Sequence, residues 1–173
     1  EPQTQKAASR AVEMVRNGEA GVLMKGLIGT SDILRAVLDK EKGLRTGRLL
    51  SHVTVINGPV GQERVVLVTD VAMNIQPDLI QKKGLIENAA QVARVLGIAE
   101  PKVAIIAAVE NVNPDMQATI DAALLAKMGD RKQIKGVKID GPLALDNAVS
   151  LEAATHKGIQ SEVAGQADIL VMP

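Results

Sequence analysis

The stretch PKVAIIAAV, residues 101–109, decides the fold class. It is a continuous apolar run of the kind that forms a strand buried on both faces. Such strands belong to parallel sheets whose two faces are both covered by helices. Helical patterns lie on either side of it, over residues 77–96 and 114–128. The centre of the chain therefore predicts a helix–strand–helix unit of an α/β protein.

Strand and helix patterns alternate through the rest of the chain. Two β-rich runs, residues 50–56 and 64–70, are joined by the loop NGPVGQE and predict a hairpin. Further strands are expected at residues 20–26, 135–139 and 168–172, and further helices at 3–17, 30–41 and about 143–156. Together these patterns predict an α/β fold with a mostly parallel sheet.

The sequence also indicates helix starts and a linker. Thr30 or Ser31 is expected to cap the helix at 30–41, and Asn113 to cap the helix that follows it. The basic, glycine-containing stretch KGLRTG, residues 42–47, is expected to be a linker and the boundary between two domains.

Composition excludes several classes of function. Twenty basic and twenty acidic side chains cancel, and there is no Phe, Tyr or Trp, so neither charge nor aromatic stacking favours nucleic acid. The absence of cysteine excludes disulfides, thiolate metal sites and a cysteine nucleophile, and it fits a reducing cytoplasm. The N-terminus is polar and no apolar run approaches ~18 residues, so we expect no signal peptide or membrane span.

The two ends of the chain suggest a piece of a longer protein. The sequence starts without Met and stops at ADILVMP, a strand-like run that in an α/β protein normally leads to another helix. We therefore expect an internal fragment, with part of any active site outside it.

Three polar stretches could carry chemistry, because ligands of open α/β sheets collect at the carboxyl ends of strands beside helix N-termini. The first, MKGLIGTSDILR at residues 24–35, combines glycines, two hydroxyls and the cations Lys25 and Arg35, which suits phosphate or another anion. It lacks the spacing of a phosphate-binding loop. The alternative is an ordinary capped helix with Arg35 in solvent, and residue types alone favour that alternative.

The other two stretches are acidic. Asp70 follows a buried strand, with Asn74 after it, and could act as a base or orient a partner, although a simple turn is the commoner outcome. In VKIDGPLALDNAVS, residues 137–150, Asp140 is expected at the end of a strand and Asp146 in the first turn of a helix. The two carboxylates could serve as acid and base or bind a metal, but the helix dipole already accounts for Asp146.

Metal and dinucleotide sites are not expected. His52 and His156 lack metal-ligand spacing. No Gly-x-Gly-x-x-Gly opens a helix after a strand, so a standard dinucleotide fold is not predicted either.

Six segments of the chain, taken in order, resemble one enzyme family. They are MKGLIGTSDILR, GLRTGRLLSHVTVI, LVTDVAMN, NPDMQATIDAALLAKM, KIDGPLALDNAVS and HKGIQSEVAGQADILVMP. They are similar to the phosphate butyryltransferases, close relatives of the phosphate acetyltransferases, and cover essentially all 173 residues. DGPLALD and S-x-V-A-G-x-A-D are the most specific motifs, and the first two segments are closer to the butyryl branch.

This resemblance implies a two-domain α/β fold like that of isocitrate and isopropylmalate dehydrogenases, with the active site in an interdomain cleft. Residues 1–45 would be part of an incomplete first domain, and residues 46–173 a second domain whose C-terminal end is missing. The implied reaction is reversible transfer of a short-chain acyl group between coenzyme A and inorganic phosphate, without a protein nucleophile. Coenzyme A enters as a substrate, no cofactor or metal is permanently bound, and members act as homodimers.

The resemblance also implies roles for individual residues. Thr30, Ser31 and Arg35 would contact phosphate groups, and Asp140 would shape the edge of the cleft. Further substrate contacts or cleft positions would be Lys25, Gly29, Asp70, Asn74, Asp146, Ser161 and Gly165. The family's Ser-Arg motif and the aspartate that assists the thiol lie beyond the last residue, so the fragment alone would not be catalytically competent.

Three alternatives remain open on this fold. An acyl carrier protein-dependent acyltransferase would need a basic docking patch, which the zero net charge does not support. A metal- and nicotinamide-dependent decarboxylating dehydrogenase would need an aspartate cluster and a cofactor loop, and the sequence contains neither pattern. A non-catalytic ligand-binding or regulatory domain would keep the fold and lack the downstream Ser-Arg pair.

Overall fold

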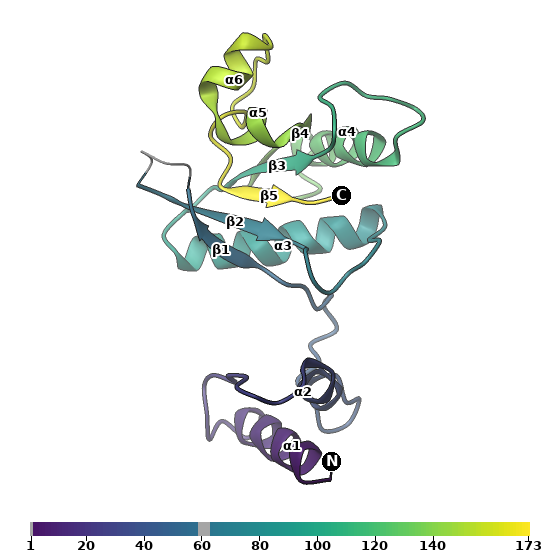
Figure 1. The fold of residues 1–173 in the computed structure, drawn as a ribbon, viewed down its shortest axis with the longest axis vertical. Helices are drawn as coiled ribbons and strands as arrows, with labels where there is room; N and C mark the ends of the chain where they lie inside the picture. Colours follow the sequence, from purple (N-terminus) through teal and green to yellow (C-terminus); the bar gives the residue numbers. More distant parts are fainter. Residues whose placement is uncertain (1, 59–62) are drawn as a thin grey trace. The chain divides into compact units, whose positions relative to one another are not determined.

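The chain forms two compact units. The structure, a computed structural model, describes residues 2–58 and 63–173. Unit 1 comprises Glu1–Arg48 and unit 2 comprises Leu49–Pro173 (Figure 1).

In its described residues unit 1 contains two helices, α1 (Pro2–Arg16) and α2 (Thr30–Val37). Both were predicted, but α2 ends at Val37 and not at residue 41. Ala8 and Val12 of α1 and Ile33 of α2 are buried, and they form the apolar faces through which the helices pack.

The prediction of a strand at residues 20–26 is wrong. This segment has no regular secondary structure, and the side chains of Val22 and Met24 are exposed. A strand needs a neighbour to bond its backbone N–H and C=O groups, and the described part of unit 1 contains no other strand.

The cap of α2 also differs from the prediction. Gly29, in an extended conformation with φ −60° and ψ 139°, is the N-cap, and no side chain bonds to the helix start. The Gly29 carbonyl accepts hydrogen bonds from the N–H groups of Asp32 at 3.1 Å and Ile33 at 3.3 Å. Thr30 and Ser31 therefore lie in the first turn with their hydroxyls not used for capping.

Unit 2 is built on a sheet. Within the described residues this sheet has five strands in the order β1-β2-β5-β3-β4. Their bounds are β1 Thr54–Asn57, β2 Val65–Thr69, β3 Lys102–Ile106, β4 Lys138–Leu143 and β5 Ile169–Val171. β1 pairs antiparallel with β2, and the other pairs are parallel. The mostly parallel α/β sheet and the predicted hairpin are thus confirmed, while residues 59–62 of the hairpin loop lie outside the described residues.

Helices cover both faces of this sheet. Helices α3 (Leu79–Val95) and α4 (Gln117–Asp130) lie on one face, and α5 (Leu145–Val149) and α6 (Leu151–His156) lie on the other (Figure 1). The side chains of β3 alternate between the two resulting cores. Val103 and Ile105 belong to the α3/α4 core, whereas Ala104 and Ile106 belong to the α5/α6 core. This alternation is why the run at 101–109 is apolar throughout.

Helix α4 begins later than predicted. Asn113 and Pro114 precede it in a turn, in which Asn113 Oδ1 accepts a hydrogen bond from Asp115 N–H at 2.9 Å. The N-cap is Met116, so Asn113 is not the cap. The predicted position was wrong because an Asn-Pro pair can stabilise a turn as well as a helix start.

Strand β4 and the helix after it correct two further expectations. β4 continues through Gly141 and Pro142 to Leu143, so Asp140 lies inside the strand and not at its end. β4 is an edge strand, where proline's missing N–H removes no ladder bond on the open side. The single helix expected at 143–156 is divided at Ser150, whose Oγ accepts from Ala153 N–H at 3.2 Å and caps α6.

Candidate functional site at the carboxyl edge

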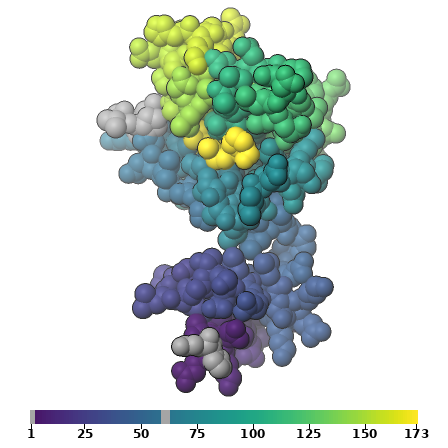
Figure 2. All heavy atoms as spheres, turned by 45° about the vertical axis from the view of Figure 1, so that its right-hand side comes forward, coloured from purple at the N-terminus to yellow at the C-terminus, as the bar shows by residue number. Residues whose placement is uncertain are grey.

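The carboxyl ends of β2, β3, β4 and β5 lie at one edge of the sheet, because these strands are parallel. Open α/β sheets bind their ligands at this edge. The segments that leave it are 70–78 after β2, 107–116 after β3 and the start of α5 after β4. The C-terminal residues that follow β5 reach the surface of unit 2 (Figure 2).

The carboxylate of Asp70 is buried and fully bonded. Its Oδ1 accepts from the backbone N–H groups of Ala72 and Met73, both at 2.9 Å. Its Oδ2 accepts from His52 N–H at 3.0 Å and from Asn74 Nδ2 at 2.7 Å. Asp70 is 7% exposed, so water cannot replace these partners at low cost. The side chain closes a turn and ties it to the segment before β1.

These bonds also set the protonation of Asp70. Burial by itself would raise the pKa of Asp70, but the hydrogen bonds from three backbone N–H groups and from Asn74 outweigh it and hold the pKa below its ordinary value. A carboxylate with a lowered pKa and no open lone pair is a poor general base. The geometry therefore favours the turn interpretation of Asp70 and Asn74.

Asp140 and Asp146 do not form a carboxylate pair. Asp140 is half-buried, and its Oδ1 accepts from the N–H of Gly141 at 2.8 Å. Asp146 is exposed at the start of α5, and its Oδ2 lies 3.5 Å from Lys157 Nζ. Nothing in the described residues joins the two side chains, so an acid–base or metal-binding pair receives no support.

Sequence reasoning missed the ion pair beside Asp146. Lys157 Nζ lies 3.0 Å from Glu110 Oε1, in the segment that follows β3. The hydrogen bond between them raises the pKa of Lys157 and lowers that of Glu110. No spacing pattern in the sequence could have indicated it, because the two residues meet only through the order of the strands.

Ser161 and Gly165 shape the loop that leads into the amino end of β5, so the structure does not group them with the residues of the carboxyl edge. Ser161 Oγ accepts from Val163 N–H at 3.0 Å and from Ala164 N–H at 3.1 Å. Gly165 has φ +75°, and a Cβ there would lie 2.4 Å from Leu151 Cα. Glycine is therefore required by both conformation and space.

The predicted residues of unit 1 are more open. Thr30 and Ser31 are exposed, and their hydroxyls donate to no acceptor in the described chain. Arg35 exposes 66% of its side chain and makes an ion pair with Asp32 at 3.3 Å. Lys25 instead donates to the carbonyls of its own loop, at 3.0 and 3.1 Å. Of the two cations in this stretch, Arg35 is the better placed for an anion.

A hollow of about 900 Å³ lies between α1 and α2, and Arg35 and Asp32 are among its lining residues. Its other charged residues include Lys6, Arg10 and Glu13. Arg35 thus has room beside it for a ligand within unit 1 itself.

The described residues contain neither a candidate metal site nor a candidate membrane-spanning helix. In residues 2–58 and 63–173, no three His, Asp or Glu side chains are grouped so that they could hold a metal ion. No helix in that same part of the chain has the length and apolar character needed to cross a bilayer.

Comparison with known proteins assigns the chain to a family. The family described as "Phosphate acetyl/butaryl transferase" matches residues 1–173. The chain belongs to this family. It is 54% identical over all its residues to the phosphate butyryltransferase of Clostridium acetobutylicum, and spans 57% of that protein. It is 50% identical over 169 residues, 98% of the chain, to the phosphate acetyltransferase of Thermotoga maritima, again spanning 57% of the relative.

The fold of this phosphate acetyl/butaryl transferase family member has a solved counterpart. A branched-chain phosphotransacylase from Enterococcus faecalis V583 superposes with a TM-score of 0.87 at 39% identity. The superposition covers 96% of this chain and 59% of the other. The chain therefore represents little more than half of the length of its relatives.

Proposed function

We propose that the full-length protein transfers a short-chain acyl group between coenzyme A and inorganic phosphate. The observation that carries this proposal is the family match over residues 1–173, with 54% identity to a phosphate butyryltransferase across the whole chain. Relatives at 54% and 50% identity are named for butyryl and acetyl groups, so the proposal covers short acyl chains as a class.

The chemistry needs binding and charge stabilisation more than a reactive side chain. A phosphate oxygen attacks the thioester carbonyl, and the carbonyl carries negative charge in the tetrahedral intermediate. The C–S bond then breaks, the acyl phosphate forms, and the thiolate leaves with coenzyme A and takes up a proton. The nucleophile and the thiol both belong to the substrates, which is consistent with the absence of cysteine from these 173 residues. Orientation and oxyanion stabilisation are the expected contributions of the protein.

Residues of both units take roles in this proposal. Arg35 would bind phosphate through its guanidinium, assisted by the hydroxyls of Thr30 and Ser31, because these groups remain open. Gly29 would let phosphate approach the helix start, with Lys25 as a weaker contact. In unit 2, the positions that would shape the substrate edge are Asp70, Asn74, Asp140 and Asp146. Ser161 and Gly165 would contribute through the loop that packs against the start of α6.

The proposal extends to the whole enzyme. Residues 1–45 would belong to one domain and residues 46–173 to a second, in a two-domain fold of the isocitrate dehydrogenase type. The enzyme would act as a homodimer in the cytoplasm, with coenzyme A as substrate and with no metal or resident cofactor.

A thiol-release assay on the full-length protein tests the function. Acetyl-, propionyl- and butyryl-CoA are offered with and without phosphate, and free CoA is measured with a thiol reagent. We expect CoA release that depends on phosphate, with acyl phosphate formed in equal amount. Absence of phosphate-dependent release with all three substrates would reject the proposed reaction and favour a non-catalytic domain.

A further inference from the structure

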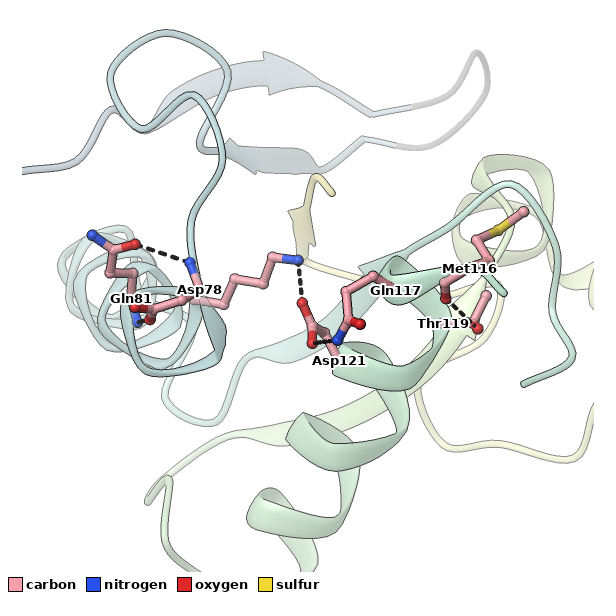
Figure 3. Close-up of polar contacts among 7 residues, drawn as sticks. Asp78, Gln81, Met116, Gln117, Thr119 and Asp121 are labelled. Atoms are coloured by element: carbon pink, nitrogen blue, oxygen red, sulfur yellow. Dashed lines mark hydrogen bonds and ion pairs between the residues drawn. The ribbon is translucent and has the colours of Figure 1, made fainter. Parts of the chain in front are cut away.

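A buried ion pair joins α3 to α4. Lys82 Nζ lies 2.7 Å from Asp121 Oδ2, and the two side chains are 7% and 8% exposed. The second carboxylate oxygen of Asp121 accepts from Gln117 Nε2 at 2.8 Å, so both oxygens are used (Figure 3). Buried ion pairs are often no more stabilising than apolar side chains of similar size. A gain in stability alone therefore does not explain why this ion pair is present.

The pair lies where the two helices begin. Lys82 is in the first turn of α3, directly after the segment 70–78 that leaves β2. Gln117 and Asp121 are in the first two turns of α4, directly after the segment 107–116 that leaves β3. Both segments start at the carboxyl edge of the sheet, so the ion pair links the helix starts on which the two edge segments end.

Each edge segment is also bonded to its own helix. Asp78 Oδ1 accepts from Gln81 N–H at 2.7 Å, and Gln81 Oε1 accepts from Asp78 N–H at 2.9 Å (Figure 3). On the other side, Thr119 Oγ1 accepts from Asn113 N–H at 2.9 Å, and its single O–H has the carbonyls of Met116 at 2.8 Å and Asn113 at 3.0 Å within reach. A shift of either helix start would therefore move the end of its edge segment.

The sheet fixes where the two segments start but not where they end. β5 pairs with both β2 and β3, and Val171 is the common partner of Thr69 and Ile105 at the ends of these strands. The helix starts at the far ends of the segments lie outside these ladders. Apolar contacts between helices permit sliding, whereas the ion pair holds Lys82 Nζ and Asp121 Oδ2 together. The ion pair thus constrains the spacing of the two helix starts.

We propose that Lys82, Asp121 and Gln117 are positioning residues that fix the spacing of the edge segments 70–78 and 107–116 for acyl transfer. This inference rests on the function proposed above. The three side chains act through the two helix starts and do not touch substrate.

The test replaces the pair by apolar groups in the full-length enzyme. Removing one partner would leave a buried charge and risk unfolding, so both are changed in the double variant Lys82→Met/Asp121→Leu. We expect its thermal midpoint to shift by less than about 4 °C. We expect kcat for phosphate-dependent CoA release to fall about tenfold to a hundredfold, because displacement of about 1 Å has effects of this size. The KM for phosphate should stay unchanged, since the proposed phosphate contacts lie in unit 1.

Two further variants make the result decisive. Gln117→Ala removes the partner of Asp121 Oδ1 and keeps the ion pair; we expect kcat to fall severalfold while the thermal midpoint falls by only about 2–4 °C. Lys83→Met/Glu87→Leu removes the neighbouring surface pair of α3, 3.7 Å between charges, and should leave kcat unchanged. If the apolar double variant does not fold, the kcat of Gln117→Ala alone tests the proposal.

Failure of this inference differs from failure of the proposed function. Wild-type kcat in Gln117→Ala, or in a folded Lys82→Met/Asp121→Leu variant, would reduce the pair to a core contact while wild-type activity persists. A wild-type enzyme without phosphate-dependent release would reject the function itself.

Discussion

Two polar stretches that contain or adjoin helix starts differ in how their hydrogen-bonding groups are used. In unit 2, both oxygens of the Asp70 carboxylate accept bonds from protein groups, and the side chain is buried. In unit 1, Thr30 and Ser31 expose hydroxyls that bond to nothing in the described chain, and Arg35 makes a single exposed ion pair. We refer to residues 70–78 as the saturated stretch and residues 24–35 as the open stretch.

The difference separates groups that hold the fold from groups that can bind. A saturated carboxylate must break protein hydrogen bonds before it can accept one from a substrate, which costs about as much as the new bond provides. An open hydroxyl exchanges only water for the ligand, and the exposed Arg35 guanidinium has N–H donors beyond the one that pairs with Asp32. Anion binding is therefore expected at the open stretch, and stability should depend more on the carboxyl edge of unit 2.

The largest effect should come from Gly165→Ala, in the loop of unit 2 that leads into the amino end of β5. A methyl group would lie 2.4 Å from a backbone atom of Leu151, at φ +75°. We expect a loss of at least about 4 kcal/mol in the free energy of unfolding, measured by urea denaturation. Gly158→Ala is the control, because φ is +68° and nothing lies within 4 Å of the added methyl. It should cost only about 1–2 kcal/mol of conformational strain. Equal losses would show that the close approach is not tight.

Asp70→Asn tests directly how much the fully bonded carboxylate of Asp70 stabilises the fold. The amide would keep one acceptor, but its NH2 group would face two donors, His52 N–H and Asn74 Nδ2. We expect a loss of about 2–4 kcal/mol at pH 7. Asp39→Asn is the control, because one exposed oxygen, Oδ1, accepts both backbone bonds there and the amide can keep them. A similar loss in both variants would contradict the distinction between buried and exposed carboxylates.

The pH dependence of stability tests the contribution of the Asp70 carboxylate in a second way. The pKa of Asp70 is lower in the folded state than the unfolded value of about 4. Its contribution to stability is therefore complete above about pH 4 and is lost as the pH falls through the folded pKa. Urea unfolding of the wild type from pH 7 to about pH 3 should show this loss. Asp70→Asn should lack that part of the decline, and an unchanged acid slope would exclude Asp70 as its source.

Much of the fold could be predicted because periodicity reports which face a side chain occupies. The apolar run of β3 predicted burial on both faces, and the structure divides its side chains between two cores. The predictions that failed depend on parts of the chain far from the residues concerned. Whether residues 20–26 find a partner strand, and whether Pro142 sits on an open edge of β4, depends on elements elsewhere in the chain.

The site was less predictable for the same reason. The sequence placed Asp70 after a strand and Arg35 within a helix, but it could not show that His52 N–H, 18 residues away, completes the bonding of Asp70. Nor could it show that Arg35 exposes 66% of its side chain beside a hollow. The sequence does contain one indication of the ion pair between Lys82 and Asp121. Lys82 precedes Leu85 and Ile86 by three and four residues, so it falls on the buried stripe of α3, where a charge needs a partner.

A smaller effect, on binding, is expected from Arg35→Ala in the open stretch. Loss of a charge-assisted contact of ~1.5–3 kcal/mol should raise the KM for phosphate about tenfold to a hundredfold in the full-length enzyme. The KM for phosphate of Arg35→Lys should lie between those of the wild type and Arg35→Ala, because an ammonium keeps the charge but lacks the planar pair of N–H donors. Lys40→Ala removes an exposed cation of unit 1 that does not line the hollow beside Arg35, and it should leave the KM for phosphate unchanged. An unchanged phosphate requirement in Arg35→Ala would make Arg35 a solvated helix residue.

The smallest effect is expected at a residue that is buried yet unsatisfied. Asn147 of α5 is 0% exposed, and neither Oδ1 nor Nδ2 has a hydrogen-bond partner in the described chain. Leucine has nearly the same shape and no polar atoms, so Asn147→Leu should raise the free energy of unfolding by about 1 kcal/mol. Asn88→Leu is the matched control, since its amide donates to Leu49 O and Ser51 Oγ, both at 2.8 Å, and it should lose about 1–2 kcal/mol. A loss at Asn147 as large as that at Asn88 would mean that its amide is satisfied, and the saturated character of unit 2 would then extend to α5.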